Sequence, residues 1–175
     1  MRLSLARLAL AAIVVAVGVG TVTASDDTPG AYWVYFGTYT GKDSKGIYRS
    51  RMDAATGKLS EPELAAEMGS PSFVAVHPNK KVLYAVGEGG GKDGGPVVAF
   101  AVDEKSGKLT KLNEDKSGDS GPCHVAVSPD GKHAVVANYG GGSSAFFKLA
   151  DDGKLAGRTS FSKHAGSGKD PGRQK

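Results

Sequence analysis

The chain has one cysteine, few aromatic side chains and no cluster of charges of one sign. Cys123 has no second cysteine in the 175 residues, which excludes an internal disulfide framework. Basic and acidic side chains are interspersed, so no nucleic-acid partner is expected. The four histidines lack metal-ligand spacing, and the glycine runs lack the G-x-x-x-x-G-K-[ST] pattern of a phosphate loop. The sequence therefore predicts neither a metal nor a cofactor.

Residues 1–24 differ from the rest of the chain. Arg2 and Arg7 are their only charged residues, an apolar run follows, and small residues precede Ser25. This succession predicts a secretory signal peptide that is cleaved before Ser25, and hence a periplasmic or secreted protein. The apolar run is short for a membrane span, although an uncleaved N-terminal anchor is the alternative. Cleavage lowers the formal net charge from +4 to +2 and leaves no stable membrane span.

The remaining chain is rich in glycine and contains an internal repeat. Gly-Lys-Leu triplets recur at residues 57–59, 107–109 and 153–155, in steps of 50 and 46 residues. A second pattern, PSFVAVHP from Pro71 and PCHVAVSP from Pro122, recurs after 51 residues. Repeats of this length, with short apolar segments between turn residues, are typical of the blades of a β-propeller.

Turn residues separate the predicted strands within each repeat. Residues 77–80 (HPNK) and 128–131 (SPDG) have proline at the second turn position, where its fixed φ already suits the turn. Each therefore predicts a hairpin. The segment 82–86 (VLYAV) is apolar at every position, which predicts a strand covered on both faces.

The predicted fold class is all-β, with four-stranded antiparallel blades in a partial propeller over residues 25–175. The blades are expected at about 31–65, 72–113 and 123–161, followed by a polar tail, 162–175. The first blade has only three predicted strands, because no segment after Ser25 supplies its opening strand. Three blades do not close a ring, since propellers have four to eight. The chain is therefore expected to be the first part of a longer propeller.

The ordered motifs carry a resemblance. YFGTYT, PSFVAVHP, LYAVGE, GPCHVAVSPDG and VANYGGGS together resemble the lactonase family of seven-bladed propellers, best known for 6-phosphogluconolactonase activity. The resemblance implies a sugar lactone bound at the central mouth of the ring. Gly87 stands where the family usually has asparagine, and the chain ends where the family continues into further blades. The family positions at the mouth correspond to Glu88, His124, Asn138, His164, Arg173 and Gln174.

Each of the predicted catalytic positions has two alternative roles, one functional and one structural. These positions are Glu88, His124 and Asn138. Glu88 follows an apolar strand and is either a general base facing a cavity or a solvated loop residue. His124 starts an innermost strand, where it reaches the propeller axis or is a structural histidine. Asn138 orients a ligand or caps its own turn. Cys123 lies on the face opposite His124 and is expected in the core.

The predicted substrate-binding positions are His164, Arg173 and Gln174, which lie in the tail. The tail crosses the mouth of a complete ring, where Arg173 binds a phosphate or carboxylate, or it is exposed and free. Hydrolysis of a sugar lactone is the function that the resemblance implies. A non-enzymatic propeller that binds a ligand or partner, and an inactive truncated chain, are the alternatives.

Overall fold

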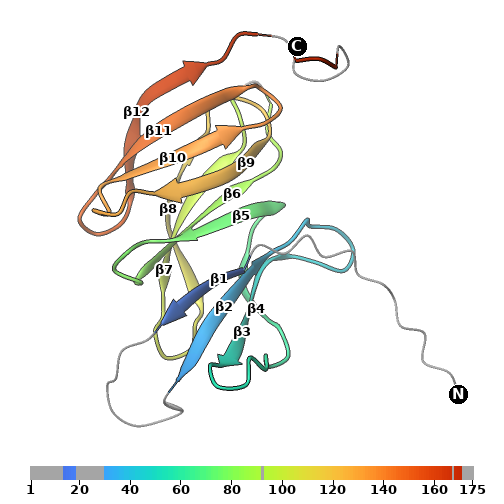
Figure 1. The fold of residues 1–175 in the computed structure, drawn as a ribbon, viewed down its shortest axis with the longest axis vertical. Coiled ribbons are helices and arrows are strands. Elements are labelled where there is room, and N and C mark those ends of the chain that lie inside the picture. Colours follow the sequence, from blue (N-terminus) through green and yellow to red (C-terminus); the bar gives the residue numbers. More distant parts are fainter. Residues whose placement is uncertain (1–13, 19–29, 92, 167, 171–175) are drawn as a thin grey trace, which may run out of the picture.

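The computed structural model describes residues 14–18, 30–91, 93–166 and 168–170. These residues form three four-stranded antiparallel sheets stacked one above the other, from the blue strands at the bottom of Figure 1 to the orange strands at the top. Among the described residues there is no helix with the length and apolar character needed to cross a membrane. The predicted all-β class with four-stranded blades is confirmed.

The first sheet has the order β1-β2-β3-β4. Its strands are β1 (Val14–Gly18), β2 (Ala31–Gly37), β3 (Gly46–Asp53) and β4 (Glu63–Glu67). The expectation that this blade lacks its opening strand is wrong, because Val14 pairs with Phe36 and Gly18 with Tyr32 along the inner edge of β2. β1 lies within the predicted signal peptide, whose other residues are outside the described ones. Its valine-rich composition, suited to an apolar leader, is equally suited to a β-strand.

The second and third sheets repeat this arrangement. The second contains β5 (Pro71–Val76), β6 (Val82–Gly87), β7 (Pro96–Val102) and β8 (Leu109–Lys116) in sequential order. The third contains β9 (Pro122–Val127), β10 (His133–Asn138), β11 (Ser143–Leu149) and β12 (Leu155–Lys163), also in sequential order. The predicted turns close as expected, with Lys80 N–H donating to His77 O at 2.8 Å and Gly131 N–H to Ser128 O at 2.9 Å.

Two apolar clusters fill the spaces between the sheets. β6 contributes alternate residues to each cluster: Leu83 and Ala85 face the first sheet, and Tyr84 and Val86 face the third. Every residue of β6 is buried, which confirms the prediction of a strand covered on both faces. The second sheet is therefore the centre of the described structure, and the clusters bind its neighbours to it.

A buried tyrosine hydroxyl crosses each interface between sheets. Tyr35 Oη of β2 donates to Gly107 O at 2.9 Å, and Tyr84 Oη of β6 donates to Gly153 O at 2.7 Å. Both acceptors belong to the repeated Gly-Lys-Leu triplets. Burial raises the pKa of Tyr84 to about 12 and raises the pKa of Tyr35 further above its usual value. Each phenol is thus a neutral donor that fixes one blade against the turn of the next.

Candidate functional site

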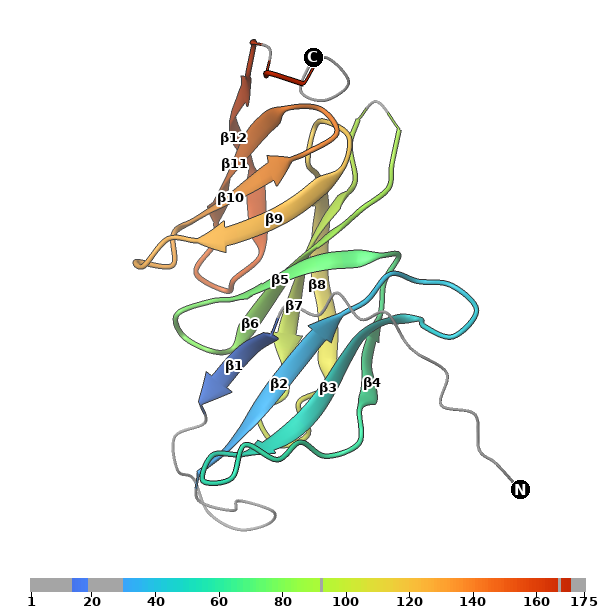
Figure 2. The same cartoon turned by 45° about the vertical axis from the view of Figure 1, so that its right-hand side comes forward.

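The loops that follow β2, β6 and β10 lie along one edge of the three sheets, at the right-hand side of Figure 2. This common edge follows from the repeat, because the second strand of every blade runs in the same direction. Glu88 follows β6, His124 is near the start of β9, and Asn138 ends β10. The fold therefore brings the predicted catalytic positions to the same edge of neighbouring blades.

Glu88 is held by one hydrogen bond that extends the β5–β6 pairing and by one that comes from the first blade. Its backbone N–H donates to Ser70 O at 2.9 Å, and its carboxylate Oε1 accepts from Tyr39 Oη at 2.9 Å. The side chain is partly exposed. Glu88 is thus neither deeply buried nor a freely solvated loop residue, because the first blade binds its carboxylate.

Gly87 lacks room for the asparagine that is usual in the family. A Cβ atom added there would lie 2.6 Å from Gly69 O and 3.0 Å from Pro96 Cγ. The backbone of the link between β4 and β5 thus takes the space beside Glu88. No side chain at this position is available to share in its hydrogen bonding.

Tyr39 is a residue of this site that the sequence analysis did not identify. It lies in the YFGTYT motif after β2, and its side chain is 55% exposed. The pKa of Tyr39 is raised mainly by the hydrogen bond to Glu88. Desolvation and the charges of Glu88 and Cys123 make smaller contributions. The phenol therefore contacts the second blade through Glu88. The motif itself was the only sequence signal, since its partner is 49 residues away.

His124 is exposed on β9, and its ring centroid lies 4.1 Å from that of Phe73 on β5. This contact crosses from the third blade to the second and orients the imidazole by ring packing rather than by a hydrogen bond. Cys123, on the other face of the strand, is half-buried, and its thiol donates to Ala137 O at 3.7 Å. Cys123 thus lies at the end of the core rather than within it.

Asn138 is 2% exposed and lies inside the third blade. Its amide Nδ2 donates to Ser143 Oγ at 3.1 Å and to Ser117 O at 3.3 Å, while Oδ1 is buried without a partner. Ser143 in turn donates to Asp119. The amide thus joins the loop before β9 to the first residue of β11, rather than capping its own turn.

His164 follows β12 and is anchored to the third blade. Its N–H donates to Gly142 O at 2.9 Å, and its Nε2 lies 3.2 Å from Ser144 Oγ. Next to it, Lys163 Nζ forms an ion pair with Asp119 Oδ2 at 2.6 Å. This contact is the main reason that the pKa of Asp119 is lowered. The start of the tail is therefore attached to the blade. Arg173 and Gln174 lie outside the described residues.

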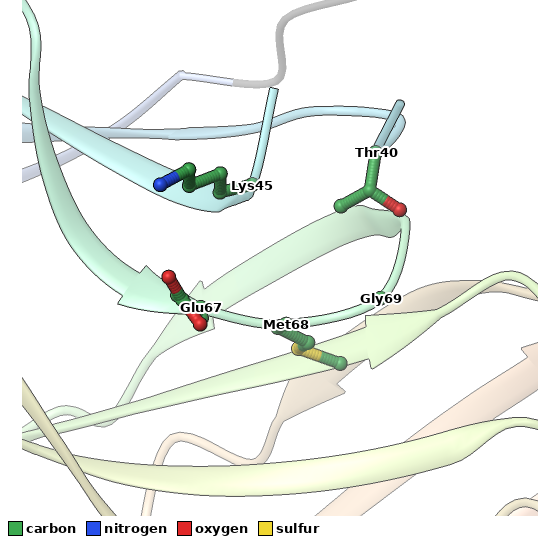
Figure 3. Close-up of a pocket in the computed structure, with 5 residues that line it drawn as sticks. All are labelled: Thr40, Lys45, Glu67, Met68 and Gly69. Carbon is green, nitrogen blue, oxygen red and sulfur yellow. The ribbon is translucent and has the colours of Figure 1, made fainter. Parts of the chain in front are cut away.

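A hollow of about 550 Å³ lies at the same edge of the first sheet (Figure 3). Its lining contains none of the predicted site residues and carries charges of both signs. The lining residues are Thr40, Lys45, Glu67, Met68 and Gly69. Over the part of the chain that the structure describes, no group of histidine, cysteine and acidic side chains has a metal-binding arrangement.

The described structure brings Glu88 together with Tyr39 and leaves the other predicted residues apart. Within the described ranges, no hydrogen bond joins Glu88, His124, Asn138 and His164 to one another. The chemistry that this arrangement supports is a carboxylate with one oxygen bound and the other available to a water molecule. The His124 imidazole, on the next blade, is a second candidate base.

Comparison with known proteins places these features in a family. The family described as "Lactonase, 7-bladed beta-propeller" matches residues 33–175. A 6-phosphogluconolactonase of Bacillus subtilis is 39% identical over 137 residues, which are 78% of this chain and 39% of that protein. The chain thus spans about two fifths of the length of this relative.

Solved structures agree with the sequence match. A Bacteroides fragilis protein superimposes with a TM-score of 0.77 and 34% identity over 86% of this chain and 41% of its own. The periplasmic gluconolactonase of Pseudomonas aeruginosa superimposes with a TM-score of 0.70 and 30% identity over 77% of this chain and 39% of its own. The chain therefore belongs to the lactonase family of seven-bladed β-propellers.

Proposed function

We propose that the protein hydrolyses a sugar lactone at the edge where Glu88 and His124 lie. The observation that carries the proposal is the Glu88 carboxylate, bound on one oxygen by Tyr39 at 2.9 Å, in a chain of the lactonase family. A fixed carboxylate at the mouth of a propeller is suited to general-base catalysis. The relatives support the reaction class, because two of them are named as lactonases.

The proposed reaction needs one proton carrier and no metal. Glu88 or His124 removes a proton from water, and the water oxygen forms a bond to the carbonyl carbon of the lactone. The bond between that carbon and the ring oxygen then breaks, and the ring oxygen receives the proton back from the base. Asn138 is proposed to act indirectly, by holding the loop before β9 in place. His164, Arg173 and Gln174 are proposed to bind the substrate, with Arg173 pairing with an anionic group.

We propose an exported protein with an unphosphorylated sugar lactone as its substrate. The basic, apolar and small-residue succession of residues 1–24 supports export, and phosphorylated sugars are metabolites of the cytoplasm. Removal of residues 1–24 would also remove β1 and leave the inner edge of β2 unpaired. Intact-mass analysis of exported protein should show Ser25 as the first residue, and a mature protein that retains Met1 would contradict cleavage.

The test of the function uses the natural gene product, defined by reading the nucleotide sequence past Lys175. Its hydrolysis of glucono-δ-lactone and of the 6-phosphorylated lactone is measured against the spontaneous rate. Glu88→Gln or His124→Ala should lower kcat/KM by about 10²-fold, the scale of a lost acid–base group. Binding of a lactone without turnover would instead favour a non-enzymatic propeller, and the absence of both would favour an inactive protein.

A further inference from the structure

The loop from Gly37 to Gly46 is fixed by threonine hydroxyls on both sides of Tyr39. Thr38 Oγ1 donates to Gly46 O at 2.6 Å and is hydrogen-bonded to Ser44 Oγ, which closes the base of the loop. Thr40 Oγ1 accepts from Ser70 N–H at 3.1 Å, which joins the loop to the link between β4 and β5. Tyr39 is therefore presented from an anchored backbone although its side chain is largely exposed.

Ser70 connects this loop to Glu88 by a second route. Its N–H donates to Thr40, and its carbonyl accepts from Glu88 N–H at 2.9 Å. Ser70 has a φ of 43°, an uncommon left-handed conformation for a residue other than glycine. The backbone and the carboxylate of Glu88 are thus tied to the same anchored loop, one through Ser70 and the other through the Tyr39 phenol.

We propose that Tyr39 is a positioning residue for Glu88, a role that rests on the proposed lactone hydrolysis. The phenol holds Oε1 at 2.9 Å and so selects one orientation of the carboxylate, which leaves Oε2 for the attacking water. Thr38 and Thr40 support this contact by fixing the loop. The YFGTYT motif then has a physical purpose, which is to carry a hydrogen-bond donor from the first blade to the base on the second.

The first test measures the contact without any substrate. The ionisation of Tyr39 is measured by ultraviolet absorbance in the 175-residue chain. The titration of Tyr39 is the difference between the curve of the original chain and the curve of the Tyr39→Phe variant. The pKa of Tyr39 is raised above 10.0 mainly by its hydrogen bond to Glu88, and least by the charge of Cys123. Glu88→Gln should therefore move this titration to lower pH, whereas Cys123→Ala should move it less. A titration that Glu88→Gln leaves unchanged would overturn the proposal.

The second test measures catalysis by the natural gene product. Tyr39→Phe should lower kcat by about 10-fold, the scale of one hydrogen bond to a charged group, with little change in KM. Tyr32→Phe, near the start of β2, is the matched control and should leave kcat and KM unchanged.

The two tests separate failure of this proposal from failure of the proposed function. If the protein without any substitution shows no lactone turnover, the proposed hydrolysis is contradicted. The absorbance titration would still decide whether Tyr39 holds Glu88. A protein that hydrolyses lactones with the same kcat when Tyr39 is replaced by Phe would overturn the positioning role and leave the function standing. Loss of affinity alone, with kcat unchanged, would overturn it as well, because Tyr39 would then act on substrate binding.

Discussion

The second and third sheets have the same strand order, but they differ in how many of their faces are covered. Every residue of β6 is buried between the two apolar clusters, whereas β10 alternates between buried and accessible residues. One face of the third sheet packs on the second through residues such as Val136 and Phe147. On the other face, Phe146 is 42% exposed. A blade is therefore stabilised mainly by its neighbours, as expected of repeat architectures.

The largest expected effect follows from the uncovered face. The 175-residue chain by itself should show no lactone turnover and should self-associate, because the site is bounded by several blades and an accessible apolar face and strand edges invite pairing. Gel filtration and a lactone assay test this. Phe146→Lys should reduce association, whereas Leu59→Lys, at a 50% exposed leucine between β3 and β4, should not. A monomeric, cooperatively melting chain with turnover would contradict the prediction.

The next effect compares truncations in the two environments. Leu83 is fully buried in the second sheet, so Leu83→Ala should lower the free energy of unfolding by about 2–5 kcal/mol. Phe146→Ala, on the accessible face of the third sheet, should change it by less than about 1 kcal/mol. Urea denaturation measures both. Similar losses for the two variants would mean that another surface covers Phe146 in solution.

The tyrosine contacts between blades give a smaller effect. Tyr84→Phe leaves Gly153 O without its donor and should cost about 1–2 kcal/mol. The folded protein raises the pKa of Tyr84 from 10.0 to about 12, so this group stabilises the fold below pH 10, and the stabilisation is lost as pH rises through 12. Tyr84→Phe should remove that part of the alkaline loss. Tyr35→Phe tests the corresponding contact at the other interface, and no alkaline change in either variant would contradict the role assigned to the phenols.

Cys123→Ala should have the smallest effect. The thiol is half-buried and makes only a weak 3.7 Å contact with Ala137 O, so its loss should cost less than about 1 kcal/mol and change lactone turnover little. Thermal melts and the lactone assay of the natural gene product measure this. If this variant is the inactive one, the faces assigned to Cys123 and His124 are interchanged.

The sequence by itself determined the repeated features of the fold. Proline in the turns at 77–80 and 128–131, the recurring Gly-Lys-Leu triplets and the apolar segment 82–86 predicted hairpins, blades and a doubly covered strand, because turn geometry and strand alternation depend on neighbouring residues. The same local patterns placed Glu88 and His124 near strand ends. The resemblance then indicated which strand ends correspond to the mouth positions of the family.

Only the tertiary structure decided which groups meet across blades. Tyr39 and Glu88 are 49 residues apart, and their contact depends on the packing of two sheets and on the loop that Thr38 and Thr40 anchor. The side chain of Asn138 meets Ser117 in the loop before β9 and Ser143 at the start of β11. The pairing of β1 with β2 depends on a free sheet edge rather than on local composition. Periodicity specifies the strands of each blade, whereas contacts between blades depend on long-range packing that no local pattern contains.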